Sequence, residues 1–233
     1  MKTTLTLALA VVAFAAVPAT AVTYSAFALF NSTNGNGGFT YGYTDKTTLT
    51  AFDTTASGTN CAITGATCLI SAANGVLPLA SVGGALATIS VPTDAVLVHP
   101  GDSDLLSNYV SFTAPAAGTY NYSISVQMRG ENSTTGIGYT PFSATWGVVS
   151  LGSRGVLTTS QFDVATLTGT ILLGAGKEFG VIIDHNDSYI GDSTGINYSI
   201  NTAVPEPAVW GMLLAGFAMV GGVARRRKSA VAA

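Results

Sequence analysis

The chain has 233 residues, of which 48% are hydrophobic and only 9% are charged, against about 25% charged residues in soluble globular domains. A net charge of −3 excludes a basic nucleic-acid-binding surface. The hydrophobic and aromatic content excludes a disordered chain, which needs low hydrophobicity and high net charge. Two histidines and twelve carboxylates also argue against a cytosolic enzyme.

The first 21 residues have the pattern of a secretory signal peptide. Lys2 is followed by an uncharged apolar run over residues 5–17 and then by small residues, including Ala19 and Ala21. The run is too short to span a bilayer as a permanent anchor, and small residues at Ala19 and Ala21 fit the site that signal peptidase reads. We therefore expect export through the Sec translocon and cleavage after Ala21.

Residues 22–203 are expected to form one domain, with four basic and eleven acidic residues and therefore a net charge of −7. Apolar and polar residues alternate with period two in several segments, which Gly, Asn, Asp and Pro clusters separate. No run of helix formers at 3.6-residue spacing reaches three turns. The pattern predicts an all-β, jelly-roll-like sandwich, with strands over 120–129, 142–148, 179–183 and 196–201 and shorter ones at 89–91, 110–112 and 171–173.

Two segments, 31–44 and 131–140, are rich in Gly, Asn and Thr. Because Gly and Asn tolerate positive φ, this composition predicts exposed hairpin loops. The alternative is a glycan-contacting edge, in which Tyr41, Tyr43 and Tyr139 offer stacking surfaces for sugar rings.

Cys61 and Cys68 are the two cysteines of the chain. An even number of cysteines in an exported protein predicts a disulfide, here closing a short loop. Two thiols without a nearby histidine do not complete a zinc site, and the Cys-x-x-Cys redox motif is absent. We expect a structural disulfide.

Acidic and amide side chains gather in a segment that follows a predicted strand. Oxygen ligands on loops suit Ca²⁺, although the spacing does not match an EF-hand. The alternative is an exposed acidic turn with no ligand. The candidate calcium ligands are Asp184, Asn186, Asp187 and Asp192, and a second acidic pair is Asp102 and Asp104.

Two patterns match parts of hydrolase sites, and neither is complete. Residues 101–105 (GDSDL) are similar to a serine-esterase block, but no Asp-x-x-His occurs that would place His185 as the base. A glycosidase needs two carboxyl groups about 5–9.5 Å apart, and this domain has only Glu131 and Glu178 besides its aspartates. We expect no catalytic residues and no cofactor, apart from a structural calcium ion if one binds.

The C-terminal segment has an uncharged run over residues 208–224, followed at once by the basic cluster 225–228. Seventeen residues in a helix span about 25 Å, close to the ~30 Å of a bilayer core. The basic cluster predicts a transmembrane helix with a cytoplasmic end. The prolines of residues 204–207 hold the preceding chain extended.

Residues 205–227 resemble the Trp form of the PEP-CTERM sorting signal: Pro-Glu-Pro, a Trp three residues on, a Met/Leu stretch, Gly-Phe and an Arg cluster. Gly211 departs from the Ala that this family usually has. The resemblance implies an exopolysaccharide-producing Gram-negative bacterium and an exosortase, a membrane-embedded cysteine-type transpeptidase, as processing partner. The residues that carry it are Pro205, Glu206, Pro207, Trp210, Gly216, Phe217, Arg225, Arg226 and Arg227.

Three body segments, 98–101, 112–120 and 192–196, also resemble the jelly-roll body of many PEP-CTERM proteins. Together these resemblances imply a signal peptide at 1–21, a sandwich at 22–203, a sorting signal at 204–228 and a tail at 229–233. They imply an inner-membrane-tethered intermediate and then a cell-surface or extracellular protein of the biofilm matrix. We expect a non-enzymatic protein that binds exopolysaccharide and no nucleic acid; the alternatives are a polysaccharide hydrolase and a ligand-free structural or adhesive protein.

Overall fold

The computed structural model describes residues 21–57, 61, 63–89, 91–131, 133, 135–145, 148–157, 161–203, 214 and 216–218. Contacts divide the chain into one unit over residues 22–203 and another over 1–21 with 204–233. No helix among the described residues is long and apolar enough to cross a membrane. The predictions that lie outside the described residues concern the signal peptide with Ala19, most of the apolar run 208–224, and Pro205, Glu206, Pro207, Trp210, Arg225, Arg226 and Arg227.

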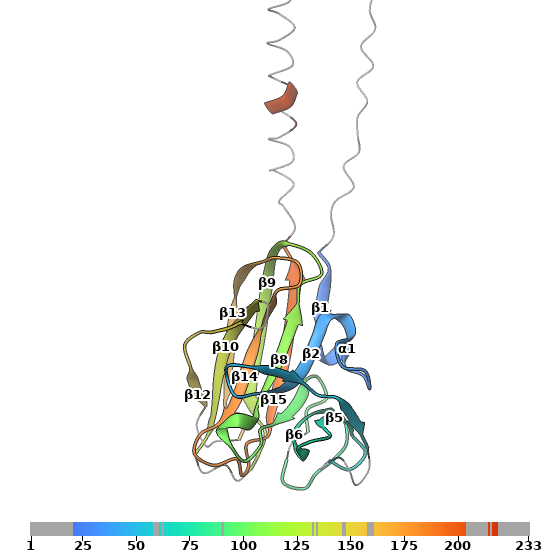
Figure 1. Ribbon diagram of the computed structural model, residues 1–233, viewed down its shortest axis with the longest axis vertical. Helices are drawn as coiled ribbons and strands as arrows, with labels where there is room; N and C mark the ends of the chain where they lie inside the picture. The colour runs from blue at the N-terminus through green and yellow to red at the C-terminus, as the bar shows by residue number, and fades with distance from the viewer. Residues whose placement is uncertain are drawn as a thin grey trace, which may run out of the picture. The chain divides into compact units, whose positions relative to one another are not determined.

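The unit over residues 22–203 consists of two antiparallel sheets (Figure 1). Sheet A has the order β13-β9-β15-β7-β6-β5-β4, with β1 also on β15. Its strands are β1 (Thr23–Ser25), β4 (Thr54–Ala56), β5 (Thr67–Ser71), β6 (Gly75–Val82), β7 (Val96–His99), β9 (Gly118–Met128), β13 (Val164–Leu173) and β15 (Thr194–Thr202).

Sheet B has the order β11-β10-β14-β8-β2-β3, with β12 also on β10. Its strands are β2 (Phe39–Thr44), β3 (Leu49–Ala51), β8 (Ser107–Thr113), β10 (Ile137–Thr145), β11 (Val148–Leu151), β12 (Gly155–Leu157) and β14 (Glu178–His185). Short helical segments are α1 (Ala26–Leu29), η1 (Asn36–Gly38) and η3 (Asp104–Leu106).

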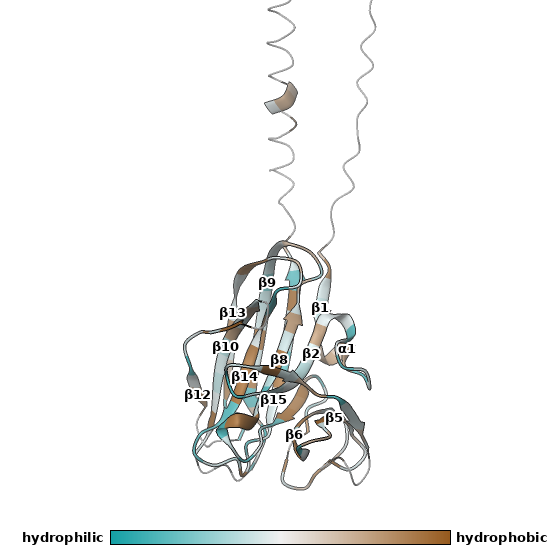
Figure 2. Cartoon of the chain, in the orientation of Figure 1, coloured by the Kyte–Doolittle hydropathy of each residue, from teal (hydrophilic) through white to brown (hydrophobic). Residues whose placement is uncertain are grey.

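The main core lies between the two sheets and follows from the period-two alternation of their strands. Figure 2 shows hydrophobic residues along β8 and β14 of sheet B. Phe39 and Phe112 of that sheet contact Tyr198 and Tyr120 of sheet A, with ring centroids 5.1 and 5.9 Å apart. All four rings are buried, so aromatic pairs join the sheets. The predicted all-β sandwich is therefore confirmed, while its jelly-roll connectivity stays a prediction.

Most predicted strands are confirmed: β14 and β15 span the predicted segments at 179–183 and 196–201, and β9 covers the segment at 120–129 as far as Met128. The segment 142–148 is confirmed only in part, because β10 ends at Thr145 and β11 begins at Val148. The strand predicted at 89–91 is not found at its two described residues: Ile89 makes isolated bridges to Leu86 and Gly130, and Val91 lies outside any strand. Two alternating apolar residues are too few to specify a strand.

A second, smaller cluster covers the outer side of sheet A at β5, β6 and β7. Val96 and Val98 belong to the main core, whereas Leu97 between them points to the opposite side. There it packs with the segment that carries the Cys61–Cys68 disulfide, whose Cα atoms are 5.8 Å apart. The predicted disulfide is confirmed, and it lies in a cluster formed by Ala56, Cys61, Ile63, Ala66, Cys68, Ile70, Leu79 and Leu97.

Candidate functional site

The outer side of sheet A carries uncharged polar side chains over β13, β9, β15 and β1. The strand register places them in three cross-strand rows. Each inward neighbour along the same strands is apolar, Gly169 and Thr202 excepted, so strand alternation alone sorts the two kinds of residue onto opposite faces. We call this surface the polar face; its rows are Thr166–Ser125–Asn197, Thr168–Ser123–Ser199–Ser25 and Thr170–Asn121–Asn201–Thr23.

Hydrogen bonds across the strands show that these side chains share one surface. Thr170 Oγ1 donates to Asn121 Oδ1 at 2.9 Å, and Asn121 Nδ2 donates to Asn201 Oδ1 at 3.5 Å. Neighbouring strands lie about 4.8 Å apart, and alternate residues along a strand about 6.8 Å apart. The polar face is thus a grid of hydroxyl and amide groups at regular spacing.

A charged residue, Arg129, lies beyond the row Thr166–Ser125–Asn197 of the polar face. Arg129, just after β9, lies over Gly195, where an added Cβ would come within 3.0 Å of the guanidinium Nε. Its Cζ stands 5.8 Å from the ring centroid of Phe162, a cation–π arrangement. Gln127 Nε2 donates to the Phe162 carbonyl at 3.2 Å. These contacts close one end of the polar face.

The tyrosines predicted as exposed stacking surfaces lie elsewhere. Residues 39–44 form β2 instead of a loop, and the Tyr41 side chain is buried, with its hydroxyl donating to the Ala26 carbonyl at 2.7 Å. Burial raises the pKa of Tyr41 well above its usual range. Tyr43 and Tyr139 are half-buried against the main core, and residues 137–140 belong to β10. The predicted loop 31–44 is therefore wrong for its second half, and Tyr41 is no stacking surface.

Asp184 is buried and binds two cations. Its carboxylate oxygens lie 2.9 Å from Lys46 Nζ and 2.8 Å from Arg154 Nη2. Asn186 accepts a second bond from Arg154 at 3.2 Å and donates to the Thr135 carbonyl at 2.7 Å. The paired carboxylate raises the pKa of Arg154 further. Asp184 is thus part of an ion-pair network and not of an exposed acidic turn.

The other predicted calcium ligands do not converge on Asp184. Asp187 is exposed, whereas Asp192 is buried and accepts a hydrogen bond from Ser133 Oγ at 2.9 Å. Burial raises the pKa of Asp192 to about 7. No three His, Cys, Asp or Glu side chains come together in a metal-binding group within the described part of the chain. The four residues therefore do not form a calcium-binding cage there.

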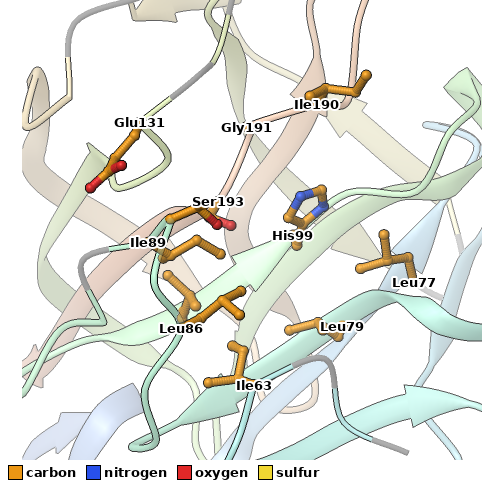
Figure 3. Close-up of a pocket in the computed structure, with 12 residues that line it drawn as sticks. Ile63, Leu77, Leu79, Leu86, Ile89, His99, Glu131, Ile190, Gly191 and Ser193 are labelled. Carbon is orange, nitrogen blue, oxygen red and sulfur yellow. The ribbon is translucent and has the colours of Figure 1, made fainter.

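A cavity of about 250 Å³ lies beside the disulfide cluster (Figure 3). Ile63, Leu79 and Leu86 gather on one side of it, with His99 and Ile190 on the other. His99 Nδ1 donates to the Pro100 carbonyl at 2.7 Å, and burial lowers the pKa of His99, which keeps the imidazole neutral. The volume is below the ~300–1,000 Å³ of typical ligand pockets, so the cavity is too small for a sugar polymer.

The residues of the two incomplete hydrolase patterns do not come together either. His185 Nε2 lies 3.7 Å from Asp104 Oδ1, but neither buried nitrogen of His185 has a hydrogen-bond partner in the described structure. Ser103 therefore has no hydrogen bond to this base. Glu131 lines the cavity on sheet A, whereas Glu178 belongs to β14 of sheet B and accepts a hydrogen bond from Ser111 at 2.9 Å.

Sequence reasoning identified β9, β15 and the end of β13 as strands, but not β1, the rest of β13 or the polar face itself. The alternation over 120–129 and 196–201 places Ser and Asn outward, and residues 166–170 continue the pattern with three threonines. What the sequence does not state is that these strands are neighbours. The usable signal was that none of the outward residues in the three rows of the polar face is charged, which is unusual for a sheet face exposed to solvent.

The described body and its uncharged face define an all-β sandwich domain. The chain beyond β15 adds a specific signal: the PEP-CTERM protein-sorting motif matches residues 203–228 and includes Gly216 and Phe217. The matched segment begins at residue 203, immediately after the last residue of β15, Thr202. The predicted resemblance of the C-terminus is confirmed, and no curated protein matches the chain in sequence.

Solved structures of several kinds are similar to the chain at low identity. Murine APRIL is 13% identical, with 71% of this chain and 98% of that chain covered and a TM-score of 0.31. The K2 cleaved adhesin domain of Lys-gingipain is 11% identical, covering 79% and 98%, with a TM-score of 0.39. A family 35 carbohydrate-binding module from Clostridium thermocellum is 12% identical, covering 53% and 88%, with a TM-score of 0.32. These values are too low to transfer a ligand or an activity.

Proposed function

We propose that the chain is an exported, exosortase-processed, non-enzymatic protein of the cell surface or matrix, whose polar face binds neutral exopolysaccharide. The PEP-CTERM motif at 203–228 supports export and processing. The grid of hydroxyl and amide groups on β13, β9, β15 and β1 supports the ligand class, and this grid is the observation that carries the proposal.

Three properties of the polar face favour a neutral, hydroxyl-rich polymer. Hydroxyl and amide groups both donate and accept hydrogen bonds, as sugar hydroxyls do. The rows repeat at regular distances, so an extended chain can bind several of them at once. The body has a net charge of −7, which repels anionic polymers at low ionic strength.

The non-enzymatic role is supported by where the candidate catalytic groups lie. Glu131 lies in a bend after β9 of sheet A, whereas Glu178 belongs to β14 of sheet B, and His185 has no hydrogen bond to Ser103. The polar face itself, as described above, has no carboxylate to act as acid, base or nucleophile. Retention of a polysaccharide without release of reducing ends is the expected behaviour; release of reducing ends would favour the hydrolase alternative.

Binding is tested by affinity electrophoresis of residues 22–203 through gels that contain dextran, galactomannan or hyaluronan. We expect at least one neutral polymer, but not hyaluronan, to retard the protein. Ser123→Glu/Asn197→Glu places two charges within the polar face and should abolish retardation. Val148→Glu/Ser150→Glu, at two exposed positions of β11 in sheet B, is the matched control, because it adds the same two charges. Equal retardation of the Ser123→Glu/Asn197→Glu variant would contradict the polar face as the site, and retardation by no polymer would favour the ligand-free alternative.

Sorting is tested separately with the full chain in a host that has an exosortase and in the same host without it. Mass spectrometry should find a mature product that has lost residues 225–228 only where the enzyme is present. Replacing Pro205, Glu206 and Pro207 with Ala should leave the basic cluster attached. An intact C-terminus in the exosortase host would contradict processing.

A further inference from the structure

The strand β13 forms an edge of sheet A and carries an unusual sequence for that position. Within the described residues it pairs with β9 and with no other strand. Its ten residues, VATLTGTILL, include no charged residue and no proline. Natural edge strands usually carry charges, prolines or bulges, or are short, because their free N–H and C=O groups otherwise pair with another chain. β13 has none of these protections along its length.

The apolar side chains on the outer side of β13 stand at its two ends. Val164 is 56% exposed and Leu172 is 79% exposed, and the threonines 166, 168 and 170 lie between them on the same side. This arrangement is symmetric about Thr168, because Val164 and Leu172 each lie four residues from it. A symmetric edge strand is complementary to an antiparallel copy of itself.

We propose that two copies of this chain associate edge to edge through β13, antiparallel, with the two-fold axis at Thr168. In this register Val164 faces Leu172 of the second copy, and Thr166 faces its Thr170. Apolar pairs and Thr–Thr pairs are among the favourable cross-strand neighbours. The pairing would continue sheet A across two molecules and satisfy the free backbone groups of both edges.

The inner side of β13 gives a second, independent argument for the same contact. Leu167 and Ile171 are only half-buried against the main core. In the proposed register Ile171 faces Ala165 of the second copy, and Leu167 faces its Gly169. A second β13 would therefore cover apolar surface on the core side, which drives association.

The association does not depend on glycan binding, and its test uses residues 22–203, which hold both sheets and the main core. Sedimentation velocity should show a concentration-dependent monomer–dimer equilibrium. Thr168→Lys places two like charges opposite each other at the axis and should weaken dimerisation at least about tenfold. Thr168→Glu should do the same. An equimolar mixture of the two variants should dimerise again, because Lys then faces Glu.

Asn197→Lys is the matched control, because it adds the same charge to the polar face two strands away from the edge. It should leave dimerisation unchanged, and all variants should unfold at the wild-type temperature at a concentration low enough for the wild type to be monomeric, since association itself raises the unfolding temperature. Register is tested with Thr168→Cys, which should cross-link to itself under mild oxidation, whereas Thr166→Cys should cross-link only to Thr170→Cys. A wild-type monomer at all concentrations, a Thr168→Lys dimer, or a Lys–Glu mixture that stays monomeric would overturn the proposal.

Discussion

At the scale of single residues, Asp184 joins three distant parts of the chain. Lys46 follows β2, Arg154 precedes β12, and Asp184 is near the end of β14. Gly138 lies opposite Asp184 in the adjacent strand, where an added Cβ would clash with the carboxylate and with Arg154. The ion-pair network therefore requires glycine at position 138, because any side chain there would displace Asp184 or Arg154.

Removing both cations should destabilise the protein more than neutralising the acid. Lys46→Met/Arg154→Leu leaves the buried Asp184 carboxylate without the cations that compensate its desolvation. We expect the free energy of unfolding to fall by about 3–5 kcal/mol, measured by urea denaturation at pH 7. Adding Asp184→Asn to that double variant should recover most of the loss. An unchanged urea midpoint in the double variant would show that the ion pairs contribute nothing.

Asp192 makes a second residue-scale prediction, on pH. Burial, the largest cause, and the charge of Asp184 raise the pKa of Asp192 to about 7, against the hydrogen bond from Ser133, which lowers it. The folded protein thus keeps a proton that the unfolded chain releases near pH 4. This contribution to stability is full below about pH 4 and is lost as the pH rises toward 7, at up to about 1.4 kcal/mol per pH unit.

The measurement compares the wild type with Asp192→Asn at each pH, so that the opposite effect of His99, whose pKa burial lowers, cancels. The difference in the free energy of unfolding should change between pH 4 and 7, with the variant gaining relative to the wild type as the pH rises. A difference that is independent of pH would contradict a raised pKa at Asp192.

At the scale of elements, the disulfide segment packs against a hydrophobic cluster of its own, on the outer side of sheet A. Cys61–Cys68 closes a loop over the cluster around Leu79 and Leu97. Cys61→Ser/Cys68→Ser should lower the free energy of unfolding by about 2–3 kcal/mol. Hydrogen exchange should rise in β5 and β6 and stay unchanged in β8 and β14. Equal acceleration in both sheets would show that the segment is not a separate cluster.

The same scale shows how far sequence patterns reach. The long alternating strands β9 and β15 were predictable because their own residues carry the period-two signal. The strand β2, by contrast, has the Gly- and Thr-rich composition of a loop, FTYGYT, and becomes a strand because it pairs with β8. Tyr109 of β8 lies over Gly42, where a Cβ would clash with its ring. These contacts with a strand far away in the sequence make residues 39–44 a strand, and the local composition gives no sign of them.

The candidate site shows the same division. The outward Ser, Thr and Asn residues could be assigned to strand faces from alternation alone, but the polar face exists only because β13, β9 and β15 are neighbours. The Asp184 network likewise unites residues 46, 154 and 184, whose spacing in the sequence carries no signal. Chemistry that one strand carries was predictable, and chemistry that several strands assemble was not.

At the scale of the whole molecule, the first and last strands of the body are hydrogen-bonded neighbours. β1 pairs with β15 in the register Thr23–Asn201, and the Val22 amide donates to Thr202 Oγ1 at 3.2 Å. The first and last residues of the unit therefore lie next to each other, at the same end of sheet A. A body arranged in this way needs neither terminal segment to complete a sheet, which suits a protein whose ends are both expected to be removed.

Charge distribution gives the last prediction. The whole chain has a net charge of −3, but residues 22–203 carry −7, because five of the nine basic residues and only one of the twelve acidic residues lie in the terminal segments. The three rows of the polar face contain no charged residue, so binding of a neutral polysaccharide there should involve no release of counterions. Its affinity should change less than about twofold between 20 and 500 mM NaCl, since salt screens only charged contacts. Isothermal titration at both salt concentrations measures this. A strongly salt-dependent wild-type affinity for the neutral polymer would place the binding surface at charged residues elsewhere.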